Sequence, residues 1–204
     1  MKRLLAIIIA VYSLVGSISA AETSDNVVYK DDHVRFTLIS PRSMRLEYSP
    51  DGKFIDGKTL LAVDRDYAPV ACKVRTGGQF VEIRTDLITV RYRKGSGAFS
   101  PENLSIQSSK ANPFGFIWRP EMTQKENLKG TRHAYDAVKG RTVMYGKDEG
   151  MNVDLEDGIL ARDGWTLIDD SKGPVFIKGD DCQGHPITKE WIERRPDNGS
   201  QDWY

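Results

Sequence analysis

The stretch HVRFTLISPRSMRLEYSPDG, from His33 to Gly52, decides the fold class of this chain. Over His33 to Ile39 apolar and polar side chains alternate, and the same alternation returns over Ser43 to Ser49. Successive side chains of a strand point to opposite faces, so a period of two predicts two strands. Each has one apolar face, and the turn signal Pro50 to Gly52 follows the second.

The same pattern continues along the chain. No window of twelve or more residues carries a clear helical period with caps, and Pro113 to Gly140 reads as a loop. Short strands at regular spacing predict an all-β fold, an antiparallel β-sandwich in one domain. The further predicted strands are Val70–Arg75, Phe80–Arg84, Leu87–Tyr92, Leu104–Gln107, Thr142–Tyr145, Ile159–Leu160, Trp165–Ile168 and Val175–Ile177.

The charge balance excludes one class of partner at the level of the whole chain. The 204 residues contain 29 basic and 29 acidic side chains, so the formal net charge is zero. Nucleic acids and anionic membrane surfaces favour basic proteins. We therefore expect neither a nucleic acid nor a membrane as a partner.

The N-terminus has the layout of a secretory signal peptide. Lys2 and Arg3 precede an apolar run from Leu4 to Val15, and small residues follow up to Ala21. A permanent membrane anchor needs about 20 apolar residues, and this run is shorter. We therefore predict a signal peptide over 1–21, a sandwich domain over 22–204 and export to the periplasm or the outside of the cell.

Cysteines and histidines are few. Export permits a disulfide between Cys72 and Cys182, but the sequence does not place them together, so free and paired thiols both stay open. His33, His133 and His185 show no metal-ligand spacing. We expect no metal site and no cofactor.

Acidic pairs are the first candidates for chemistry. Glu156-Asp157, Asp169-Asp170 and Asp180-Asp181 could supply the two carboxylates of a glycosidase, which must flank the scissile bond about 5–10 Å apart. Neighbours along a strand point to opposite faces, so the interpretation we prefer is turn and surface carboxylates. No nucleophile motif is present in the sequence.

Aromatic residues and one sharp corner are the candidates for binding. The four tryptophans could stack on sugars or simply pack in the core, and we favour packing. Arg162 and Asp163 stand at a tight turn, where they could offer donors and acceptors to hydroxyl groups. The alternative is a corner that satisfies itself, with Asp163 bonding its own turn backbone. Both interpretations stay open.

Two motifs carry a family resemblance. NLKGTRHAYD, Asn127 to Asp136, followed by LEDGILARDGWTLIDDS, Leu155 to Ser171, resembles the N-terminal domain of glycoside hydrolase family 31, of the α-glucosidase and α-xylosidase type. FSPENLSI, Phe99 to Ile106, and the closing QDWY, Gln201 to Tyr204, support it. The resemblance covers nearly all of the chain after the signal peptide.

The resemblance implies a galactose-mutarotase-like sandwich that packs on a catalytic barrel and extends a loop to the substrate pocket. Arg162 and Asp163 would lie on that loop as accessory substrate contacts. The family's catalytic aspartates lie on a (β/α)₈ barrel of about 250 residues, which this chain lacks, so no catalytic residue is carried over. The implied substrate of the whole enzyme is an α-linked glucoside or xyloside, and the isolated chain should be inactive.

A free-standing carbohydrate-binding or protein-interaction sandwich is the alternative from a different class. It predicts measurable sugar affinity and good solubility without a partner. A non-catalytic domain of a larger glycosidase predicts weak sugar binding and an exposed apolar face. The final aromatic pair, Trp203 and Tyr204, reads as exposed at the end of the chain.

Overall fold

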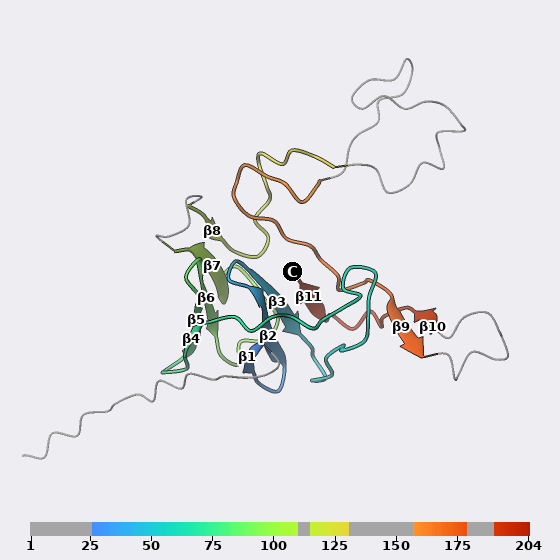
Figure 1. The fold of residues 1–204 in the computed structure, drawn as a ribbon. Coiled ribbons are helices and arrows are strands. Elements are labelled where there is room, and N and C mark those ends of the chain that lie inside the picture. Colours follow the sequence, from blue (N-terminus) through green and yellow to red (C-terminus); the bar gives the residue numbers. More distant parts are fainter. Residues whose placement is uncertain (1–25, 110–114, 131–156, 179–189) are drawn as a thin grey trace, which may run out of the picture.

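The computed structural model describes residues 26–109, 115–130, 157–178 and 190–204. Within these ranges every regular element is a β-strand, and all strand pairs are antiparallel (Figure 1). The predicted all-β, antiparallel sandwich is therefore confirmed. In the same part of the chain, no helix has the length and apolarity needed to cross a lipid bilayer.

Two sheets form the sandwich, and a separate two-stranded ribbon lies beside them (Figure 1). The first sheet has the order β1-β2-β3-β11, made of Val27–Lys30, Val34–Ser40, Ser43–Tyr48 and Gln201–Trp203. The second sheet has the order β4-β5-β6-β7-β8, made of Lys73–Arg75, Phe80–Arg84, Ile88–Arg93, Leu104–Ser108 and Ile117–Trp118. The ribbon pairs β9, Val175–Lys178, with β10, Glu190–Glu193.

The core forms where the apolar faces of the two sheets meet. Phe36 on β2 is fully buried and meets Tyr92 on β6 edge to face, with ring centroids 5.5 Å apart. Phe99 packs 5.7 Å from both rings. Edge-to-face rings add about 0.5–1.5 kcal/mol to the free energy of burial, so these three rings join the sheets firmly.

Strand boundaries follow the predictions closely in the first half of the chain. The expected strands at His33–Ile39 and Ser43–Ser49 appear as β2 and β3, paired with Phe36 opposite Leu46. Val70–Arg75 is shorter than predicted, because only Lys73–Arg75 pairs with β5. Thr142–Tyr145 lies outside the described residues.

The predictions of strands at Ile159–Leu160 and Trp165–Ile168 are wrong. Neither segment is a regular strand, although Ile168 exchanges two backbone hydrogen bonds with Tyr204, at 2.8 and 2.9 Å. Pairing over one residue is too short to define a strand. Trp165 and Leu167 nevertheless pack against the core, and for Trp165 this agrees with the packing role we favour for the tryptophans.

The end of the chain is not an exposed aromatic pair, which corrects the prediction. β11 pairs with β3 so that Trp203 lies opposite Leu46, on the apolar face. The Trp203 ring packs 5.6 Å from Phe99 and 6.3 Å from Trp118. The last strand therefore completes the first sheet and closes one side of the core.

Candidate functional site

The predicted corner at Arg162 and Asp163 belongs to an arm made of residues 124–130 and 157–165. The two segments run together above the sheets in Figure 1, in yellow and orange. Leu128 N donates to the carbonyl of Leu160 at 2.9 Å, and an isolated bridge joins Asn127 to Ala161. The arm is therefore held by hydrogen bonds between segments that are far apart in the sequence.

Asp163 ties the corner to the other half of the arm. Its Oδ2 accepts hydrogen bonds from the backbone N–H of Lys125 at 3.0 Å and of Glu126 at 2.9 Å. Gly164 follows with a φ of 78°, which glycine adopts without strain. Asp163 thus bonds the backbone of the neighbouring segment, which differs from the interpretation in which it bonds its own turn backbone.

Arg162 occupies the outer side of the same corner. Its backbone N–H donates to the carbonyl of Glu126 at 3.0 Å, while its side chain is exposed. No described carboxylate lies within ion-pair distance of its guanidinium. The guanidinium is therefore the part of the predicted pair that faces solvent.

Asn127 is a positioning residue that sequence reasoning missed. Its side-chain amide donates to the carbonyl of Gly158 at 2.8 Å, and its Oδ1 accepts from the N–H of Gly158 at 3.0 Å. A Cβ at Gly158 would stand 2.8 Å from the carbonyl oxygen of Lys129, so the approach requires glycine. The only signal in the sequence was the Asp157-Gly158 pair, which suggests a turn but names no partner.

A large apolar groove lies where the arm meets the sandwich. Its volume is about 1270 Å³, and its inner wall includes Met44, Leu46, Ile88, Ile106, Trp118 and Leu167. Arg162 and Gly164 line it from the corner. The predicted corner is therefore part of the wall of this groove.

The rim of the groove is apolar and exposed. Val63, Ile159 and Leu160 are 59%, 68% and 65% exposed, and Leu61 and Leu128 stand beside them at 41% and 56%. Single exposed apolar residues are ordinary, but several around one groove mark an interaction surface. The groove therefore has the character of an interface.

Hydrolytic chemistry has little support in the groove. Asp64 is the one carboxylate among the lining residues that the structure describes, and a glycosidase needs two. Trp118 and Trp165, which both line the groove, pack on each other with ring centroids 6.3 Å apart, and Trp118 also packs 6.3 Å from Trp203. That arrangement favours core packing over an open sugar platform.

The predicted acidic pairs divide between surface and interior. Asp157 forms an ion pair with Lys129, and Asp169 accepts a hydrogen bond from the N–H of Ser171 at 2.9 Å, which fits turn and surface roles. Asp170 is buried and pairs with Arg195 at 3.0 Å, so the surface interpretation is wrong for this residue. Glu156 and the pair Asp180-Asp181 lie outside the described residues.

The candidate metal and redox residues give no cluster. No group of three or more metal-ligating side chains occurs among the residues that the structure describes. His33 hydrogen-bonds the carbonyl of Ser49 through Nδ1 at 3.0 Å, and His133 and His185 lie outside the described residues. Cys72 is a half-buried free thiol whose pKa burial raises, and Cys182 lies outside the described residues.

A buried ionic network on the outer face of the first sheet was also not predicted from the sequence. Arg35 and Glu47 form two hydrogen bonds at 2.6 and 2.7 Å, and Arg45 and Asp202 form two at 2.7 Å. Arg45 also lies 3.0 Å from Glu47, so positive and negative groups alternate across the strands. These four side chains, with Arg195 and Asp170, are each at most 9% exposed.

The pKa values of two buried carboxylates in the network shift in opposite directions. Burial acts to raise the pKa of Asp202, but hydrogen bonds from Arg45 and Arg195 outweigh it and hold the pKa below its ordinary value. Burial raises the pKa of Glu47 against the opposing effect of Arg35 and Arg45. The network joins β2, β3 and β11 through side chains that are buried and paired with one another, and none of them lines the groove, so its role is structural.

Neither the models of known protein families nor the curated proteins give a match to this chain.

Proposed function

We propose that this chain is the non-catalytic N-terminal β-sandwich of an exported retaining α-glycosidase of glycoside hydrolase family 31. The catalytic barrel of that enzyme packs into the apolar groove. The observation that carries the proposal is the groove itself, an apolar hollow of about 1270 Å³ with an exposed apolar rim. The resemblance of Asn127 to Asp136 and Leu155 to Ser171 to the family supplies the identity of the partner.

The arm supports the same proposal. Asn127 and Asp163 hold its two segments together through hydrogen bonds to backbone groups. A loop that contacts a substrate in another domain must keep a fixed conformation before the substrate binds. The hydrogen bonds of Asn127 and Asp163 preorganise the arm in this way. Arg162, exposed at the corner, is the residue we propose for an accessory contact to an α-linked glucoside or xyloside.

The residues of the groove support a catalytic role for the partner domain and not for this chain. Retaining glycosidases use two carboxylates about 5–5.5 Å apart, and Asp64 has no second carboxylate beside it among the described lining residues. Both catalytic acids would come from the barrel. The isolated chain would then bind no cofactor and turn over no glycoside.

The first test is an assay of the purified, secreted chain on aryl α-glucosides and α-xylosides. We expect no turnover above that of a denatured sample. Turnover that follows the protein through purification and disappears on denaturation would overturn the non-catalytic role.

The second test separates this proposal from a free-standing carbohydrate-binding module. Calorimetric titration with maltose and xylo-oligosaccharides should give no heat beyond dilution, because the tryptophans pack on each other. Saturable binding that Trp165→Ala abolishes would favour the binding module and contradict our proposal.

A further inference from the structure

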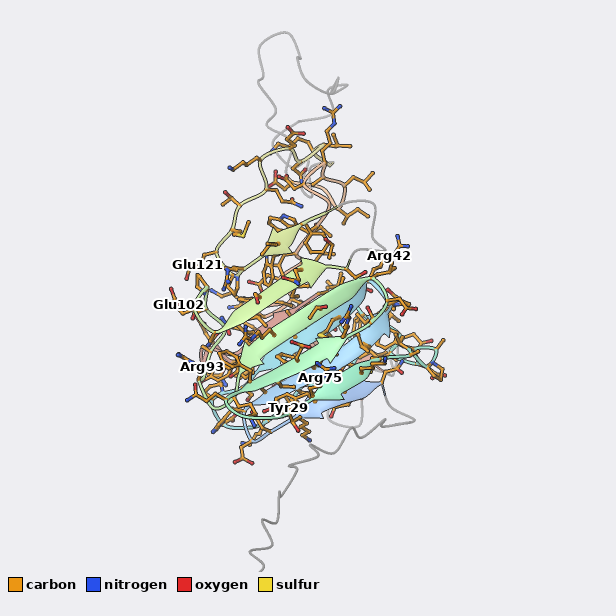
Figure 2. All side chains as sticks on the ribbon, turned by 90° about the vertical axis from the view of Figure 1, so that its left-hand side faces the viewer. Tyr29, Arg42, Arg75, Arg93, Glu102 and Glu121 are labelled. Atoms are coloured by element: carbon orange, nitrogen blue, oxygen red, sulfur yellow. The ribbon has the colours of Figure 1, made fainter. Side chains whose placement is uncertain are left out.

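The outward face of the second sheet carries an array of positive charges, turned toward the viewer in Figure 2. Glu82 is the single acidic residue in β4, β5 and β6, and its nearest cation is Arg75 at 3.9 Å. The exposed cations of these strands are Lys73, Arg75, Arg84, Arg91 and Arg93. A chain of zero net charge therefore gathers five exposed cations and one carboxylate on three neighbouring strands.

The spacing of the array is set by the sheet. Lys73 lies opposite Arg84, and Glu82 lies opposite Arg91, in the antiparallel registers of β4-β5 and β5-β6. Neighbouring strands stand about 4.8 Å apart, and same-face residues along a strand are about 6.6 Å apart. The alternate residues, such as Val81 and Val90, are buried in the core, so the cations cannot turn inward.

Hydroxyl and amide groups continue the face beyond the cations. Thr89 lies opposite Arg84 on one side and Gln107 on the other, and Ser105 lies opposite Arg91. A polymer that binds across these strands would meet cations first and neutral hydrogen-bonding groups next.

A shallow hollow marks the cationic end of the face. Its volume is about 410 Å³, and Lys73, Arg75 and Arg84 line it together with Glu82 and Asp86. The hollow lies at the edge where β4 has no further described strand beside it. With three cations against two carboxylates, the lining of the hollow has a small positive excess, which favours an anionic group.

We propose that this face binds an acidic polysaccharide, a glycan that carries carboxylate or sulfate groups. Such a polymer presents both anions for the arginines and hydroxyl groups for Thr89, Ser105 and Gln107. Arginine is the side chain best suited to carboxylate and sulfate, because its guanidinium donates two parallel hydrogen bonds.

The face suits other polyanions less well. Sheets that bind single-stranded nucleic acid stack bases on exposed aromatic rings. The one aromatic ring on this face, Phe80, is half-buried and lies under the Arg91 guanidinium at 4.0 Å. The face of a five-stranded sheet also offers no helix or two-stranded ribbon that could enter the groove of a duplex.

This proposal does not rest on the proposed function. The groove opens toward the arm and involves the inward side of the second sheet, whereas the cations are on its outward side. Both surfaces could be occupied at once, and each can fail without the other.

The experiment measures binding of the purified chain to immobilised polygalacturonate and heparin, with neutral dextran and single-stranded poly(dT) as further probes. We expect binding to both acidic glycans that weakens as salt rises, and none to dextran. Arg84→Gln/Arg91→Gln/Arg93→Gln should lose about tenfold in affinity, since exposed ion pairs each contribute modestly. The variant with lysine at these three positions should bind more tightly than the glutamine variant and more weakly than the wild type, because it keeps the charge and loses the paired hydrogen bonds of arginine.

The matched control removes three exposed cations elsewhere, with Arg42→Gln/Lys125→Gln/Arg194→Gln. It should change the affinity less than about twofold, because net charge alone has a small effect at physiological salt. Thermal melts of all variants show whether each still folds. Absence of binding to both acidic glycans, equal loss in the control, or tighter binding to poly(dT) than to either glycan would overturn the proposal.

Discussion

The outer face of the first sheet and the rim of the groove reverse the usual places of charged and apolar side chains. The outer face of the sheet buries Arg45 and Asp202, at 3% and 4% exposed, whereas the rim of the groove leaves Ile159 and Leu160, both on the arm, more than 60% exposed. The buried charges are all paired within the chain, so that face is complete by itself. The exposed apolar rim has no such partner among the described residues, and we propose the groove as the surface that another molecule covers.

We expect the largest loss in the free energy of unfolding when the buried ionic network is disrupted. Asp202→Ala removes the partner of Arg45 and Arg195 and leaves two buried cations without it. Loss of one member of a buried ion pair costs about 3–5 kcal/mol in the free energy of unfolding. Urea denaturation measures it, with the exposed Asp197→Ala as the control expected to change little. A loss below about 1 kcal/mol would mean that the network does not stabilise the fold.

Low pH should reduce the stabilisation that Asp202 gives to the ionic network. The folded-state pKa of Asp202 lies below its unfolded value, so its stabilisation is present above about pH 4 and is lost as the pH falls through the folded pKa. Glu47 acts with the opposite sign, because its raised pKa makes protonation favour the folded state. Urea denaturation from pH 7 down to pH 3 should therefore show a steeper loss in Glu47→Gln than in the wild type. An acid dependence that is equal or shallower in Glu47→Gln would contradict these signs.

A substitution at the Arg162–Asp163 corner should have an intermediate effect on stability, smaller than in the ionic network and larger than in the groove rim. Asp163→Ala removes two hydrogen bonds to the backbone amides of Lys125 and Glu126, and we expect a cost of about 1 kcal/mol, confined to the arm. Hydrogen exchange should accelerate at these two amides and stay unchanged in β2 and β6. Acceleration throughout the sandwich would show that the corner supports the whole fold.

The smallest effect on stability should come from the groove. Val63→Glu/Leu160→Glu replaces exposed side chains and should change the free energy of unfolding by less than about 0.5 kcal/mol for each substitution. The same pair should reduce binding of an apolar dye and self-association in sedimentation, because the rim is no longer apolar. Equal dye binding by the wild type and the variant would show that the rim is not an open apolar surface.

The sequence predicted the faces of the strands better than it predicted what covers them. The period of two over His33 to Ile39 assigned Phe36 to one face and Arg35 to the other, and both assignments are correct. It could not predict that Arg35 and Arg45 are buried, because alternation alone is equally compatible with a solvated polar face. The partner of Arg45 is Asp202, 157 positions away in the chain.

In the candidate site, too, local features could be predicted from the sequence and distant partners could not. The Asp163-Gly164 turn is local, so its tight corner with a positive φ at Gly164 could be predicted from the sequence. The partners of Asp163, Lys125 and Glu126, are about 40 positions away, and Asn127 gives no local sign that it holds Gly158. The groove needs residues from both sheets and from the arm, so only the folded chain reveals it.

The most direct measurement of the central claim is binding of this chain to a family 31 catalytic barrel produced without its own sandwich. We predict a complex in sedimentation or calorimetry that forms with the wild type and with Arg162→Ala but not with Val63→Glu/Leu160→Glu. Absence of a complex with several such barrels, or a complex that the groove substitutions leave intact, would contradict the claim that the groove receives the catalytic domain.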